Sequence, residues 1–175
     1  MAQTVIPIYV GVAFFRTQGS PIQLAIVLST HKSFVNDVYC GTVIQSVNGW
    51  VQSWKSSDKP VAFDPYLELM GIIAVATVQR ANLTPLHVYQ SVFGMGWTSQ
   101  EPCDPKAKIK VCDGNMHAQS NDFVRRALAH LWNQQIINPP VNANDKDLGR
   151  NILECLIKLQ RSPSTFNSYS LIPIA

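Results

Sequence analysis

The chain has 175 residues, a length that fits one domain with its own hydrophobic core, so residues 1–175 are expected to form a single domain. Charged residues make up only 14% of the sequence, and the formal net charge is +3. The basic residues are scattered apart from a small cluster at Lys106, Lys108 and Lys110, whereas a nucleic-acid-binding protein requires a continuous basic stripe, so nucleic acid is not an expected partner.

The N-terminal stretch MAQTVIPIYVGVAFF predicts a β-strand rather than a targeting segment. It has no basic lead-in and no small-residue cleavage site, and Pro7 interrupts its apolar run, so it does not have the pattern of a signal peptide. No apolar run approaches the roughly 20 residues that span a bilayer. We therefore expect a cytoplasmic protein with no membrane span, although a mature secreted form would have the same features.

The first half of the chain predicts a β-sheet. Runs rich in β-branched and apolar residues predict strands over residues 5–15, 22–29, 37–47, 50–54 and 71–79. Asn48 and Gly49 suit a tight hairpin between the third and fourth strands, because both tolerate positive φ angles. Several runs lack clean alternation of apolar and polar residues, so the strands should be covered on both faces, with the later helices as the cover.

The second half predicts helices. Residues 82–93 have Thr84 as an N-cap and Pro85 at the first helical position, where a missing N–H is harmless. A connection dense in Pro, Asp and Gly follows, and its KAKIKV segment could form a short edge strand. Strands followed by helices predict an α+β domain, with an antiparallel sheet packed against helices.

A second helix is predicted over residues 118–138, ending before Pro139 and Pro140. Its apolar stripe consists of Phe123, Val124, Ala127, Leu128, Leu131 and Trp132. Arg125 and Arg126 lie off this stripe. A third helix is predicted over residues 146–161, and the apolar end of the tail, residues 161–175, is expected to pack back on the body.

Two of these segments resemble motifs of the circularly permuted papain-like NlpC/P60 superfamily, which includes the lecithin–retinol acyltransferase group. In that superfamily a strand carries a His, and a later helix begins with an Asn-Cys motif. This chain has QLAIVL over residues 23–28 and QSNDFVRRALAHL over residues 119–131. The hairpin VNGWVQSW is similar to one in a family of small uncharacterised fungal proteins. The resemblance spans residues 5–138 and implies a permuted papain-like arrangement of the sheet and helices.

Both reactive residues of that superfamily are replaced in this chain. Gln23 stands at the His position and Ser120 at the Cys position. The superfamily's mechanism needs a thiolate, which a helix N-terminus and a His stabilise together. A serine hydroxyl is a far weaker acid and needs a base within hydrogen-bond reach, and Gln23 cannot accept a proton. The aligned pair is therefore inactive as a Cys–His dyad.

Three interpretations of this region remain open. Ser120 or Asn121 can be a helix N-cap with no chemical role. Ser120 can instead form a catalytic pair with His117, oriented by Asp113 or Asp122. A substitute nucleophile, Cys40 or Cys112, is the third possibility.

The remaining candidates point to binding rather than to metal chemistry. None of the four cysteines has the CxxC spacing of a zinc site, and Asp113 with His117 lacks a third ligand, so neither a metal nor a cofactor is expected. Cys103 and Cys112 could pair in an oxidising compartment, but we expect thiols. Trp50 and Trp54 lie an even number of residues apart on one strand and so share a face, which would be a binding patch if exposed.

The leading hypothesis from the sequence is a non-catalytic binding domain that keeps a degenerate papain-like site. Gln23, Gln119 and Ser120, with Trp50 and Trp54, would bind a partner protein or a small acyl- or peptide-like ligand. One alternative is a hydrolase or acyltransferase that uses Ser120 with His117 or a substitute cysteine. A self-associating structural protein is the second alternative, suggested by the low charge.

Overall fold

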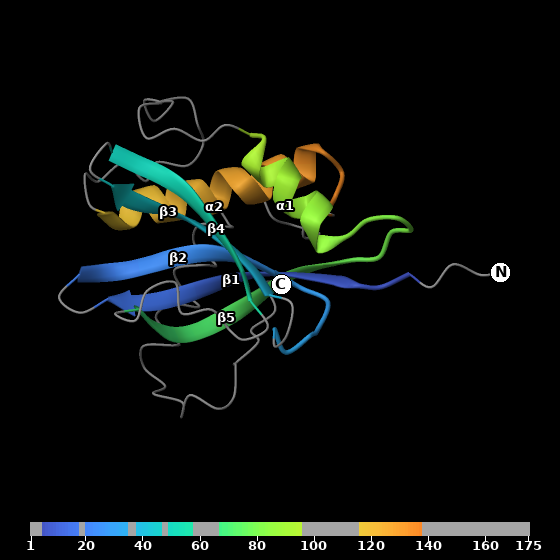
Figure 1. Ribbon diagram of the computed structural model, residues 1–175, viewed down its shortest axis with the longest axis horizontal. Helices are drawn as coiled ribbons and strands as arrows, with labels where there is room; N and C mark the ends of the chain where they lie inside the picture. Colours follow the sequence, from blue (N-terminus) through green and yellow to red (C-terminus); the bar gives the residue numbers. More distant parts are fainter. Residues whose placement is uncertain are drawn as a thin grey trace.

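The computed structural model describes residues 5–17, 20–34, 38–46, 49–57, 67–95 and 116–137. This part of the chain contains the strands β1 (Ile8–Thr17), β2 (Ser20–Ser29), β3 (Val38–Ser46), β4 (Gly49–Ser57) and β5 (Leu67–Val78) and the helices α1 (Pro85–Phe93) and α2 (Met116–Asn133). Each of the five predicted strands overlaps an observed one. The expected α+β class, an antiparallel sheet with helices, is confirmed (Figure 1). The predicted KAKIKV strand, the third helix and the tail lie outside the described residues.

The strands form one antiparallel sheet in the order β4-β3-β2-β1-β5. The predicted hairpin between β3 and β4 is present, and its pairing runs from Val38 opposite Ser57 to Ser46 opposite Gly49. Gly49 is therefore the first paired residue of β4, and the prediction that it is a turn residue is wrong. By contrast, β2 pairs with β3 only from Ile26 opposite Gly41 to Leu28 opposite Tyr39. In Figure 1, β3 and β4 turn away from the other three strands on the side where the helices lie.

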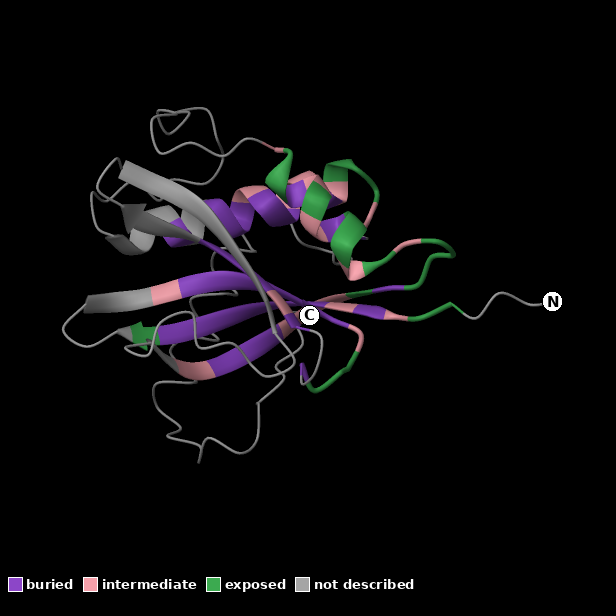
Figure 2. Cartoon of the chain, viewed as in Figure 1, coloured by how far each residue is buried: buried purple, intermediate pink, exposed green. Residues whose placement is uncertain are grey.

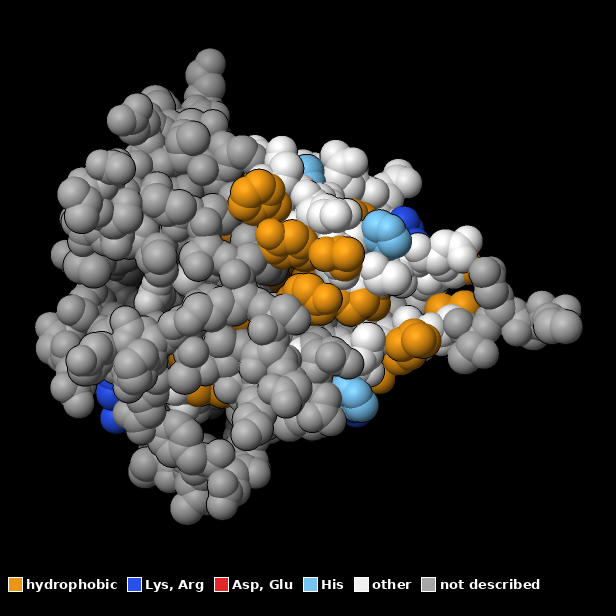
Figure 3. Space-filling model, viewed as in Figure 1, with side chains coloured by type: hydrophobic (Ala, Val, Ile, Leu, Met, Phe, Trp, Pro, Cys, Tyr) orange, Lys and Arg blue, Asp and Glu red, His pale blue; other side chains and the backbone are white. Residues whose placement is uncertain are grey.

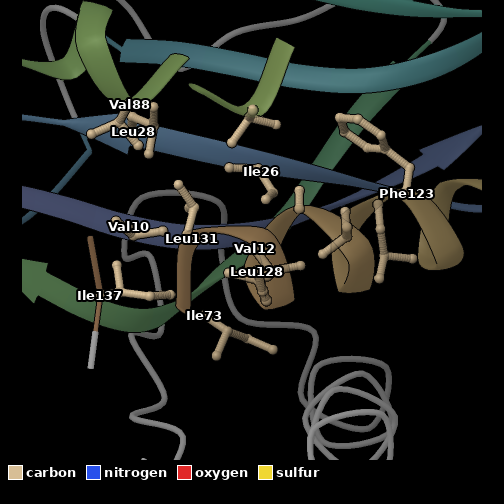
Figure 4. Packing of buried hydrophobic residues seen from close by; sticks show 14 of the residues in the cluster. Val10, Val12, Ile26, Leu28, Ile73, Val88, Phe123, Leu128, Leu131 and Ile137 are labelled. Atoms are coloured by element: carbon tan, nitrogen blue, oxygen red, sulfur yellow. The ribbon is translucent and has the colours of Figure 1, made fainter. Parts of the chain in front are cut away.

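Both faces of the central strands are buried, as the lack of alternation predicted (Figure 2). On one face, α1 and α2 pack over a first cluster that includes Val12, Ile26, Ile73, Val88, Phe123, Leu128 and Leu131 (Figure 4). The opposite face holds a second cluster: Ala13, Phe15, Ala25, Val27, Phe34, Val38, Cys40 and Ile72. No residue of the described helices belongs to this second cluster. The expectation that helices cover both faces is therefore wrong for α1 and α2, which both pack on the first face.

Gly11 has no room for a side chain. A Cβ atom there would lie 2.9 Å from a side-chain atom of Ile72, from the carbonyl oxygen of Ile73 and from the ring of Phe34. The register between β1 and β5 shifts between Val10 and Gly11. Phe34 adopts a left-handed φ of 51°, which is unfavourable for a residue with a side chain, and its ring is buried. The missing Gly11 side chain therefore makes room for the Phe34 ring.

Helix α1 begins as the sequence predicted. Thr84 is its N-cap and Pro85 its first residue. The Thr84 hydroxyl accepts a hydrogen bond from the His87 amide at 3.3 Å, and the Thr84 amide donates to Nδ1 of His87 at 3.1 Å. These two bonds form a capping box, which satisfies donors that the first helical turn leaves free.

Helix α2 is more enclosed than its apolar stripe predicted, and its ends differ from the prediction. It begins at Met116, two residues before the predicted start, and Arg125 is only 4% exposed although it lies off the stripe. It ends at Asn133, well before Pro139. Gln135 has a left-handed φ of 56°, and the Ile136 amide donates to the Leu131 carbonyl at 2.9 Å. This is the geometry of a Schellman motif, so the backbone terminates α2 before the prolines.

Candidate functional site

Ser120 lies inside α2 and is 1% exposed. The interpretation of Ser120 or Asn121 as an N-cap is wrong, because the helix begins at Met116. The Ser120 Oγ atom accepts a hydrogen bond from the Leu24 amide of β2 at 3.1 Å, across a sequence separation of 96 residues. The hydroxyl therefore connects the helix to the backbone of the sheet.

Thr42 binds the other polar group of the Leu24 backbone. Its Oγ1 atom donates to the Leu24 carbonyl at 2.7 Å, and Thr42 is fully buried. Leu24 lies just beyond the three positions at which β2 pairs with β3. Side-chain hydroxyls from α2 and β3 thus satisfy both backbone groups of Leu24 where the ladder between these strands stops. Buried backbone groups need such partners, so the two hydroxyls stabilise the junction of β2, β3 and α2.

Gln23 is half-buried beside this junction. Its Nε2 atom donates to Thr42 Oγ1 at 3.5 Å, the long limit of a hydrogen bond. Alternation along β2 places Gln23 on the face of Ala25 and Val27, whereas α2 packs on the other face. Gln23 and Ser120 are therefore neighbours through the Leu24 backbone and Thr42, and they approach the strand from opposite faces.

Two of the three histidines with described side chains make contacts elsewhere in the fold, and the third is exposed. His87 belongs to the α1 capping box, and His31 is exposed in the turn after β2. His130 Nε2 lies 3.0 Å from Ser91 Oγ and so connects α2 to α1. His117 lies in the first turn of α2, three residues before Ser120, but its side chain is outside the described residues, as are the side chains of Gln119 and Asp122. Within the described part of the chain, no imidazole is bonded to Ser120.

The other candidates for chemistry are closed or lie elsewhere. Cys40 is a fully buried residue of the second cluster, which is a poor position for a nucleophile. Cys103, Cys112 and Asp113 lie outside the described residues. Among the residues that the structure describes, no three His, Cys, Asp or Glu side chains are grouped as metal ligands would be.

Trp50 and Trp54 both lie on β4, opposite Gln45 and Gly41 of β3. Their side chains are outside the described residues, so the prediction of an exposed binding patch there stays a prediction.

The sequence reasoning missed Thr42, although it is central to the junction. A threonine inside an apolar strand is typical of β-structure and gives no signal of its own. Its contact with Leu24 depends on where the pairing of β2 and β3 stops, which neither segment shows by itself.

Comparisons of this chain with protein-family models, with curated proteins and with solved structures find no match. In the part of the chain that the structure describes, neither helix has the length and apolar character needed to cross a bilayer.

Proposed function

We propose that this chain is a non-catalytic binding domain. The observation that carries the proposal is the state of Ser120, which is buried and already accepts the Leu24 amide. A catalytic serine needs access to its substrate and a base within hydrogen-bond reach. The described surroundings of Ser120 supply neither, and Cys40 is equally inaccessible. A contact that stabilises the fold accounts for Ser120 without any chemistry.

The permuted papain-like frame remains part of this proposal. In such a frame, the residue at the nucleophile position of a helix lies next to the strand residue that would be the His. The hydrogen bond from Leu24 to Ser120 brings α2 to the residue that follows Gln23. This proximity of the two segments supports the resemblance, while the Gln23 side chain lies on the opposite face of β2 from α2. Ser120 and Gln23 would then be the replaced pair, and the binding function would use the surface of the domain rather than a reactive centre.

A fluorophosphonate probe tests the absence of catalysis. Such a probe modifies a serine that is both accessible and activated by a base. We expect the folded full-length chain to show no adduct at Ser120 by peptide mapping, and to match the Ser120→Ala variant. A stoichiometric adduct at Ser120 that the His117→Ala substitution abolishes would overturn the proposal and establish the hydrolase or acyltransferase alternative.

A pair of substitutions tests the papain-like frame separately. Gln23 reaches the junction through Thr42, and a His at this position would favour a thiolate at residue 120 if the frame is papain-like. If the frame is papain-like, local opening of the junction should bring the two side chains together. Iodoacetamide should then alkylate residue 120 faster in the Gln23→His, Ser120→Cys double variant than in Ser120→Cys alone. Equal rates in the two folded variants would reject the frame but leave the non-catalytic binding function standing.

A further inference from the structure

The outward side of α1 carries an apolar surface that the described part of the fold leaves exposed. Val88 and Val92 point into the first cluster, whereas Leu86 is 44% and Phe93 is 53% exposed. Tyr89 lies between them at helical spacing and is half-buried. In Figure 3, hydrophobic side chains form a band over this side of the molecule, and the Lys and Arg side chains lie at its margins. We call Leu86, Tyr89 and Phe93 the α1 patch.

Neighbouring contacts hold the α1 patch in place. The rings of Tyr89 and Phe93 are stacked with centroids 6.0 Å apart, and Tyr39 of β3 contacts Tyr89 with a centroid distance of 6.3 Å. The contact between Ser91 of α1 and His130 of α2 also fixes α1 against α2. A patch whose side chains are already ordered loses less conformational entropy when it binds a partner.

We propose that the α1 patch is the interface through which two copies of this chain associate, and this inference rests on the proposed binding function. The argument for a second copy is one of charge. Residues 81–95 contain no Asp, Glu, Lys or Arg. A two-fold contact sets a surface against its own copy, so a charged patch would repel itself, whereas an uncharged apolar patch does not. The small net charge of +3 adds little long-range repulsion.

The same lack of charge argues against a membrane or a different protein as the partner of the α1 patch. An interfacial helix that binds a membrane carries Lys or Arg along its polar side, and α1 has none. A surface that selects a different protein ordinarily uses complementary charges to do so, and the patch provides no charge to match. In an antiparallel contact of two α1 helices, Leu86 of one copy would lie opposite Phe93 of the other, with the two Tyr89 rings near the symmetry axis.

Sedimentation velocity on the full-length chain tests this inference. We expect the wild-type chain to shift from monomer to dimer between about 1 and about 100 μM, since one short helix makes a small interface. Leu86→Glu should raise the dimer Kd by about tenfold or more, because each dimer would bury two like charges. An acidic residue in the first turn favours the helix dipole, so this variant should keep α1 folded.

Lys32→Gln is the matched control. It changes the net charge by the same amount as Leu86→Glu, in the exposed turn after β2, and should leave the Kd unchanged. Phe93→Ala is the second variant and should weaken the dimer without adding charge. A wild-type chain that stays monomeric overturns the inference, and so does a dimer that both patch variants leave intact. If the chain stays monomeric and binds phosphatidylcholine vesicles, the α1 patch would be a lipid-binding surface. That result would also overturn the inference of self-association. None of these outcomes affects the fluorophosphonate test of Ser120.

Discussion

The Ser120 hydroxyl accepts a hydrogen bond from the Leu24 amide at 3.1 Å, and this contact connects residues from opposite halves of the chain. It lies where β2 stops pairing with β3, so it replaces a bond that a continuous ladder would supply. The residue that the sequence marked as a possible nucleophile therefore has a structural use in the fold.

Removing this hydroxyl should destabilise the protein. Ser120→Ala leaves the Leu24 amide buried without an acceptor, and we expect the free energy of unfolding to fall by about 1–3 kcal/mol. Chemical denaturation measures this loss. Ser91→Ala is the control, because its hydroxyl contacts His130 at a half-buried site where water can replace it, so its effect should be smaller. Equal effects of the two substitutions would contradict the role given to Ser120.

Gly11 should not tolerate a methyl group. Gly11→Ala would place a Cβ atom 2.9 Å from three neighbours, one of them the backbone carbonyl oxygen of Ile73. We expect a loss of about 1–3 kcal/mol in the free energy of unfolding, as for an overpacked core. Gly94→Ala is the control, since Gly94 has ordinary helical angles at the end of α1, and its effect should stay within about 0.5 kcal/mol. A neutral Gly11→Ala would show that β1 and β5 are not packed this closely.

Glycine should be the better residue at position 135. Gln135 has a left-handed φ of 56° in the motif that ends α2, a conformation that glycine adopts without strain. The bond from Arg80 to this residue uses the backbone oxygen, so the substitution preserves it. We expect Gln135→Gly to raise the free energy of unfolding by about 0.5–1 kcal/mol. Gln134→Gly, one residue earlier, should not stabilise; a gain there equal to that of Gln135→Gly would contradict the assigned motif.

Substitutions at Thr84 and His87 should lower the stability of the protein according to how well the new side chain can replace the capping hydrogen bonds. Thr84→Ala removes the cap and should destabilise by about 1 kcal/mol, whereas Thr84→Ser should retain most of the stability. His87→Gln should be milder than His87→Ala, because a glutamine side chain can also bond back to the amide at the N-cap. Thermal unfolding of the four variants measures this order. A Thr84→Ala variant as stable as Thr84→Ser would exclude the cap as a stabilising feature.

Local signals predicted the strands and the start of α1, because each depends on residues close together in the sequence. The β-branched runs form β1 to β5, and Thr84 with Pro85 marks the beginning of a helix. The sequence did not predict where α2 ends, because the prediction relied on a local glycine or proline signal. Its left-handed residue is Gln135 rather than a glycine, so the sequence contains no local stop signal before the prolines.

From the sequence, the candidate site was only a pairing of two distant segments, and its papain-like character stays a prediction. The resemblance to a papain-like pattern paired the region of Gln23 with the region of Ser120, and the structure places Ser120 against the residue that follows Gln23. It could not predict that Ser120 would be buried or that Thr42 would join the junction. Both depend on how far β3 follows β2 before it turns away, which is a property of the packed sheet.

The measurement that tests the role of Ser120 most directly is hydrogen exchange at the Leu24 amide. In the wild-type chain this amide should be protected, although it lies beyond the paired positions of β2 and β3. In Ser120→Ala its exchange should accelerate by about tenfold or more relative to the Val27 amide, which lies within the paired region. Rapid exchange of the Leu24 amide in the wild-type chain, or the same protection in both proteins, would show that Ser120 does not hold α2 to the sheet.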